Sequence, residues 1–199
     1  MKRTVSVAMV LTVAFVGLSA VLSANAQTPT PTPDPKVEKE KKEIRSKATE
    51  AQKRLYKLKP MAKTAVESSF GYATFSNTGV KILVTGSGRG KGVAVNNKTK
   101  AETFMKMLEL QAGLGFGVSK FSLVFVFETE KAFRNFVDSG WQFGGETTAA
   151  AKMGTKGAAF DGAVSVSEGV WLYQMTDKGL ALEITVKGTK YFKDDDLNK

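Results

Sequence analysis

The chain has 199 residues, 42% of them hydrophobic, with a formal net charge of +10 and neither cysteine nor histidine. This length and composition predict a folded protein with its own hydrophobic core. The missing Cys and His exclude a disulfide scaffold, a thiolate or imidazole metal site, a cysteine nucleophile and any triad with a histidine base. We therefore expect no metal site and no cofactor. We also expect no enzyme, with an enzyme that uses Ser, Lys or carboxylates as the remaining alternative.

Residues 1–26 have the pattern of a signal peptide. Lys2 and Arg3 precede an apolar stretch at residues 5–22, and Ala24 and Ala26 fit the small-residue pattern that signal peptidase cleaves. We predict cleavage after Ala26 and a periplasmic or secreted protein. An uncleaved membrane anchor is the alternative, because the apolar stretch approaches the length that spans a bilayer.

A linker and a basic helix are predicted next. Alternating Thr and Pro at residues 27–35 predict an extended polyproline-II segment. Residues 36–59 lack Gly and Pro and are rich in helix formers, which predicts a basic amphipathic helix that Pro60 ends or kinks. Its apolar residues lie on one stripe: Ile44, Ala48, Ala51, Leu55, Leu58 and Ala62.

The positive charge is concentrated in this helix. Residues 36–63 contain 11 basic and 4 acidic residues, whereas residues 64–199 contain 16 basic and 14 acidic ones. We expect no nucleic-acid partner, because such a protein more often carries its charge on the folded face that meets the groove. The helix can pack its stripe on the protein's own core, contact an anionic membrane, or do both. The candidate lipid-binding residues on it are Lys41, Lys42, Arg45, Lys53, Arg54 and Lys57.

The rest of the chain, a glycine-rich body at residues 70–199, has the texture of strands. Runs of β-branched and aromatic residues predict strands at 80–85, 122–127, 160–166, 170–173 and 180–186, of which 122–127 is apolar on both faces and should be central. Residues 128–137 have helical spacing, with Thr129 as the candidate N-cap. Residues 36–199 are therefore predicted to form one α+β domain. Its core should be a mainly antiparallel β-sheet or barrel, with the N-terminal amphipathic helix and one or two short helices.

Two rows of alternating glycines are the most unusual feature of this body. The pattern at residues 85–92 fits neither a P-loop nor a dinucleotide-binding turn, because the required first glycine and the following helix are missing. Alternating glycine instead predicts strands with one bare face, approached by a helix or ring of the same protein or by a ligand. The candidate groove residues are Gly86, Gly88, Gly90, Gly113, Gly115 and Gly117. Arg89 and Lys91, on the opposite face or rim, are the candidate anion contacts.

Two further sets of residues have ordinary structural interpretations. Residues 194–196, three consecutive aspartates, are interpreted as a solvated terminal run, because the glycine and distal glutamate of a calcium loop are missing. Trp141 and Trp171 are expected in the core, with a membrane-interface position as the alternative.

Several segments, in chain order, resemble the SYLF domain in its bacterial exported form. They lie at residues 70–76, 79–84, 86–93, 106–117, 124–127, 139–145, 169–174 and 187–192, with Phe133 and Phe136 on the helix between. The resemblance covers residues from about 51 to 198. It implies a non-catalytic domain that binds lipid, especially phosphoinositide or another anionic phospholipid, with a basic N-terminal helix implicated.

For a bacterial envelope protein, we expect the anionic lipid to be phosphatidylglycerol, cardiolipin or lipopolysaccharide at a membrane surface. The alternative function is a non-catalytic protein–protein scaffold, in which the glycine rows accept a strand or helix of another envelope protein. Charge screening separates the two, because binding by the basic helix would weaken in salt.

Overall fold

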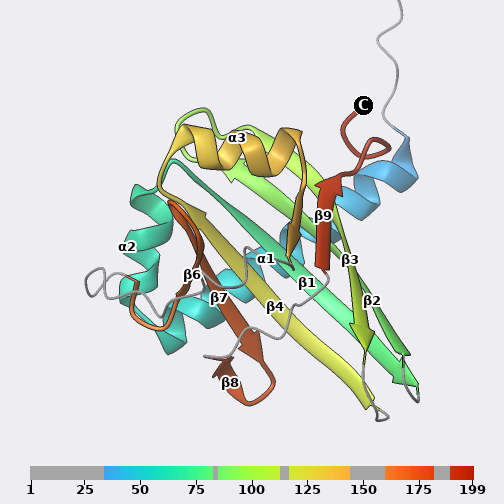
Figure 1. The fold of residues 1–199 in the computed structure, drawn as a ribbon. Coiled ribbons are helices and arrows are strands. Elements are labelled where there is room, and N and C mark those ends of the chain that lie inside the picture. The colour runs from blue at the N-terminus through green and yellow to red at the C-terminus, as the bar shows by residue number, and fades with distance from the viewer. Residues whose placement is uncertain (1–33, 83–84, 113–116, 144–159, 182–188) are drawn as a thin grey trace, which may run out of the picture. The chain divides into compact units, whose positions relative to one another are not determined.

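The computed structural model describes residues 34–82, 85–112, 117–143, 160–181 and 189–199, all within one compact unit (Figure 1). The predicted signal peptide and all of the linker before Asp34 lie outside these residues, as do Gly113 and Gly115, and they stay predictions. The described residues form three helices and nine strands. The predicted α+β class with a mainly antiparallel sheet is confirmed.

The first helix, α1 (Pro35–Leu58), begins where its N-cap favours it. The Asp34 side chain accepts a hydrogen bond of 2.8 Å from the Lys36 amide, and Pro35 occupies the first turn, where no amide donor is needed. The predicted stripe is buried at Ile44, Ala48, Ala51 and Leu55.

The chain changes direction at Pro60, which separates α1 from α2 (Met61–Ser68). Ala62 continues the predicted stripe and is buried, together with Ala65 and Val66. Leu58, which was predicted to lie on the same stripe, is 41% exposed. The helix ends at this residue, so Leu58 lies at the turn rather than against the sheet.

All nine strands belong to one sheet in which every pairing is antiparallel. They are β1 (Gly71–Ile82), β2 (Thr85–Asn96), β3 (Glu102–Ala112), β4 (Gly117–Phe127), β5 (Trp141–Phe143), β6 (Val164–Ser167), β7 (Val170–Thr176), β8 (Gly179–Ala181) and β9 (Thr189–Lys193). The order is β5-β9-β3-β2-β1-β4-β7-β6, with β8 also paired to β7.

Two strand predictions need correction. The run at 80–85 was predicted as one strand, but Ile82 ends β1 and pairs with Thr85, the first residue of β2. The run thus belongs to two adjacent strands, because the glycine row pairs back on the residues before it. The strand predicted from Phe160 begins only at Val164, since residues 160–162 form a short turn.

Other predictions of local structure are confirmed. Residues 123–127 of β4 are fully buried, as expected for a central strand. The third helix, α3 (Glu130–Asp138), follows Thr129, whose hydroxyl accepts a hydrogen bond of 3.2 Å from the Ala132 amide. Trp171 is 4% exposed and its ring stacks on Phe160, so core packing is correct for this residue.

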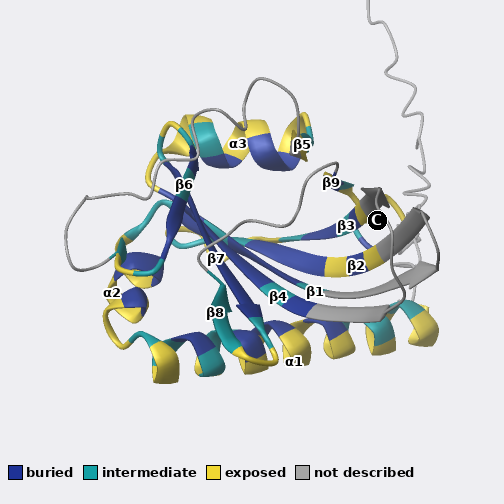
Figure 2. Cartoon of the chain, turned by 60° about the horizontal axis from the view of Figure 1, so that its bottom comes forward, coloured by how far each residue is buried: buried dark blue, intermediate teal, exposed yellow. Residues whose placement is uncertain are grey.

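The two faces of the sheet are covered by different helices, with α3 on one side and α1 along the other (Figure 2). The α3 side contains an aromatic core of Phe75, Phe125, Phe127, Phe136 and Tyr191. The Phe127 and Phe136 ring centroids, for example, are 4.9 Å apart. The α1 side is packed by alanines, Ile44 and Leu55 of the helix against valines, Trp171 and Tyr173 of the strands.

Candidate functional site

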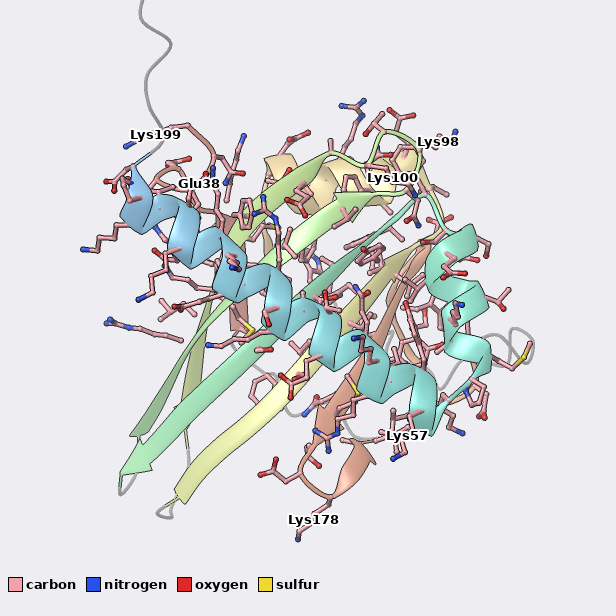
Figure 3. The ribbon with its side chains drawn as sticks, turned by 180° about the vertical axis from the view of Figure 1, so that it is seen from behind. Glu38, Lys57, Lys98, Lys100, Lys178 and Lys199 are labelled. Carbon is pink, nitrogen blue, oxygen red and sulfur yellow. The ribbon has the colours of Figure 1, made fainter. Side chains whose placement is uncertain are left out.

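The outer face of α1 is basic toward both ends of the helix. At 100° per residue, the positions opposite the buried stripe include Lys39, Lys42, Lys53 and Lys57, and all four are exposed. None of these lysines forms an ion pair with a carboxylate in the part of the chain that the structure describes. Lys57 points away from the sheet near the C-terminal end of the helix (Figure 3). Three of the four, Lys42, Lys53 and Lys57, are predicted lipid-binding residues.

Two other predicted residues, Lys41 and Arg45, lie on the flank of α1 that faces β3. Arg45 donates a hydrogen bond of 2.8 Å from Nε to Glu102 Oε2, and Lys41 lies 3.2 Å from Glu38. Both cations also lie over the Phe104 ring, at 5.7 Å for Lys41 and 5.1 Å for Arg45. These side chains therefore help to hold α1 on the sheet.

The opposite flank of α1 borders a groove of about 860 Å³ between the helix and the sheet. The last three predicted basic residues, Arg54, Arg89 and Lys91, line it. Arg54 donates to the Thr176 carbonyl oxygen, and Lys91 pairs with Glu40 of α1. Arg89 is exposed and forms no ion pair with a described residue. The eight predicted basic residues are thus divided among three places rather than gathered on one surface.

The glycine row lies on β2, and Gly92 faces the aromatic core. The space there is filled, because a Cβ at Gly92 would clash with the Phe75 ring and with the Thr74 carbonyl oxygen. Gly90 is buried and lines the groove beside α1. Gly86 and Gly88 belong to β2, and Gly117 is the first residue of β4.

The C-terminal aspartates were interpreted as solvated, and this is wrong for Asp194, which is 1% exposed. Its carboxylate lies 2.8 Å from Lys106 Nζ and 3.7 Å from Lys91 Nζ. The hydrogen bond to Asp194 is the main reason that the pKa of Lys106 is raised. A run of three aspartates carries no spacing that identifies one of them as buried, so the sequence alone could not single it out.

The residues after Asp194 are also packed against the sheet. The Asn198 side chain accepts a hydrogen bond of 2.9 Å from the Phe104 amide and donates one of 2.7 Å to the Phe104 carbonyl oxygen. Leu197 is 2% exposed and contacts the cluster of Ile44, Ala48 and Val93. This segment therefore closes the N-terminal half of the α1 interface.

Within the described ranges, no cluster of three or more acidic residues is placed to hold a metal ion. None of the described helices is long and apolar enough to cross a membrane.

Comparison with known proteins gives two matches. Residues 108–199 match the family described as Ysc84, Las17-binding protein actin regulator. Over 156 residues, 78% of this chain, the sequence is 33% identical to Beta cell expansion factor A of Aeromonas veronii. The chain spans 58% of the length of that relative. These matches, together with the fold and the ordered segments described above, place the chain in the Ysc84/SYLF family.

Proposed function

We propose that this protein is a non-catalytic, exported envelope protein that binds anionic phospholipid surfaces through the outer face of α1. The observation that carries the proposal is the row of exposed lysines Lys39, Lys42, Lys53 and Lys57, which lack carboxylate partners among the described residues. Membership of the SYLF family supports lipid as the ligand, and the predicted signal peptide supports a periplasmic or secreted location.

The length of the lysine row favours a surface over a single small anion. From Lys39 to Lys57 the helix extends about 27 Å, which is more than one headgroup can bridge. Each basic residue close to an anionic membrane contributes about 1 kcal/mol, so four of them together give appreciable binding that salt weakens. Ser46 and Thr49 lie between the lysines on this face, so most of α1 would rest on headgroups without inserting.

One end of the row offers a small apolar contact. Leu58 and Met61, on either side of Pro60, are 41% and 50% exposed and lie next to Lys57. An apolar pair beside a basic helix can enter the boundary between headgroups and acyl chains. We expect this turn to be the part of the protein that reaches deepest into the membrane.

The test is co-sedimentation of the exported protein with vesicles of phosphatidylcholine alone or with added phosphatidylglycerol or cardiolipin, at low and moderate salt. We expect binding only to the anionic vesicles and release by salt. The Lys42→Glu/Lys53→Glu/Lys57→Glu variant should lose this binding, because it reverses the charge of the row.

The matched control is Lys98→Glu/Lys131→Glu/Lys178→Glu, which changes net charge equally at exposed positions outside α1. It should retain most of the binding. Equal losses in the two triple variants would contradict a specific surface. Absence of wild-type binding to anionic vesicles would favour the protein–protein scaffold instead.

A further inference from the structure

The groove between α1 and the sheet is elongated and distinct from the lysine row. Its helical wall runs from Glu40 to Arg54, about 21 Å at 1.5 Å per residue. Its volume of about 860 Å³ is in the range of small-molecule sites. These dimensions suit a single extended chain better than a compact ligand.

The groove has an apolar lining along this length. Its apolar residues on the α1 side are Ile44, Ala51, Leu108 and Phe192, contributed by α1, β3 and β9, whereas the side chains of Met107 and Phe121 belong to the aromatic core. On the helix side, the lining residue Ala51 is small, whereas Ile44 contributes a larger apolar side chain. Leu108 is 36% exposed, so part of this apolar surface is accessible to solvent. Burying such surface under a hydrocarbon chain is favourable by about 25 cal/mol per Å².

Charges of both signs alternate along the rim. Glu43, Lys47, Glu50 and Arg54 follow one another on the same flank of α1 at spacings of four, three and four residues. Glu43, Lys47 and Glu50 form no ion pair with a described residue.

Across the groove, the sheet side repeats this pattern. Arg89 and Asp177 also line it and carry opposite charges without a mutual ion pair. The rim therefore differs from the outer face of α1, where the exposed lysines Lys39, Lys42, Lys53 and Lys57 lie. It complements a headgroup that itself carries a cation and an anion.

We propose that this groove binds a single-chain zwitterionic phospholipid, with the acyl chain along the apolar lining. Arg54, Arg89 or Lys47 would contact the phosphate, while Glu43, Glu50 or Asp177 would contact the ammonium group. The proposal does not depend on membrane binding by the lysine row, because the two surfaces lie on different sides of the helix.

The test is isothermal titration calorimetry of the exported protein with lysophosphatidylethanolamine below its critical micelle concentration. Lysophosphatidylglycerol and a fatty acid of equal chain length are the comparison ligands. We expect saturable binding with a preference for lysophosphatidylethanolamine. No saturable binding, or equal binding of all three ligands, would overturn the proposal.

Two variants locate the site. Leu108→Arg places a charge on the exposed part of the apolar lining and should weaken binding about tenfold or more. Glu43→Lys/Glu50→Lys makes the helical rim wholly basic and should invert the preference toward lysophosphatidylglycerol, by about threefold to tenfold. An inverted headgroup preference is a change that partial unfolding would not produce. An unchanged preference for lysophosphatidylethanolamine would mean that Glu43 and Glu50 do not contact its ammonium group.

The control separates this proposal from membrane binding. The Lys42→Glu/Lys53→Glu/Lys57→Glu variant should keep full affinity for lysophosphatidylethanolamine even if it no longer sediments with anionic vesicles. Leu108→Arg should still sediment with them. If either variant lost binding of both lysophosphatidylethanolamine and anionic vesicles, the groove and the lysine row would not be independent sites.

Discussion

The two faces of the sheet are built from different kinds of residue. On the α3 side, phenylalanine and tyrosine rings fill the space, and even a missing side chain at Gly92 is matched by the Phe75 ring. On the α1 side, the helix meets the sheet through alternating small and large residues, Ala48 and Ala51 beside Ile44 and Leu55, and is held at its edge by the Arg45–Glu102 ion pair. One face is filled by its own side chains, whereas the other leaves a groove and a row of exposed lysines.

The difference indicates which face is available for binding. Rings packed at centroid distances of 5 to 6 Å leave no room for a ligand, so the α3 side contributes stability. Among the described residues, the α1 side has fewer contacts between aromatic rings and carries ion pairs such as Arg45–Glu102 and Lys91–Glu40, and it leaves surface accessible. Substitutions on the two faces should therefore separate stability from binding.

The largest expected effect is on the aromatic face. Phe125→Ala removes a fully buried ring that contacts Phe75, Phe136 and Tyr191, and should lower the free energy of unfolding by about 3–5 kcal/mol. Phe192→Ala, at a half-buried ring lining the groove, should cost only about 1 kcal/mol. Urea unfolding measures both. Equal costs would remove the contrast between the faces.

A smaller effect is expected from adding a methyl group to the aromatic face. Gly92→Ala forces a Cβ against the Phe75 ring and the Thr74 backbone, and should destabilise the protein by about 1–3 kcal/mol. Thermal unfolding measures the loss. Adding Phe75→Leu should recover part of it and not all, because the Thr74 carbonyl oxygen cannot move as a side chain can. Full tolerance of Gly92→Ala would mean that this face is less tightly filled.

The ion pairs of the α1 side can be tested at Asp194. Asp194→Asn leaves Lys91 and Lys106 without their buried carboxylate and should cost about 1–3 kcal/mol. The pKa of Lys106 should also fall toward its ordinary value, because the hydrogen bond to Asp194 is the main cause of its rise. A titration of the Lys106 side chain by NMR reports this. An unchanged titration would mean that Asp194 does not control Lys106.

The smallest effect concerns Tyr56, where α1 faces Tyr72. Burial is the main cause that raises the pKa of Tyr56 to about 12. The unfolded chain loses this proton near pH 10, so the contribution of Tyr56 to stability is full below that pH and declines between about pH 10 and 12. The difference in tyrosinate absorbance between wild type and Tyr56→Phe should show this late ionisation. A difference spectrum that appears near pH 10 would contradict the burial of Tyr56 under α1.

The sequence predicted features that depend on local spacing. The stripe at Ile44, Ala48, Ala51 and Leu55 follows helical periodicity, and Thr129 is a local N-cap, so both could be identified without the structure. Partner choice across the sheet has no such local signal. Nothing near β3 indicates that it pairs with β9, and this pairing is what brings Lys106 to Asp194.

The same limit explains the outcome for the candidate site. The basic character of α1 could be predicted, but the direction of each side chain depends on what packs beside it. Arg45 faces Glu102 and Arg54 faces Thr176, both distant in sequence. Lys39 is absent from the predicted lipid-binding residues, because these were chosen by charge and not by their position opposite the buried stripe. Helical geometry, at 100° per residue, could have identified its position from the sequence.

The place of β9 between β3 and β5 bears on how the chain folds. Strands β1, β2 and β3 pair with one another as neighbours in sequence, but Met107 of β3 must find Tyr191 of β9. Closing so long a loop slows folding. Strand β5 pairs with β9 in the described sheet, so it can join the sheet only after β9 has paired. We infer that the hairpins form early and that the aromatic face is completed late. During that interval the unpaired edge of β3 is open to pairing with other chains, so refolding yield should fall as protein concentration rises.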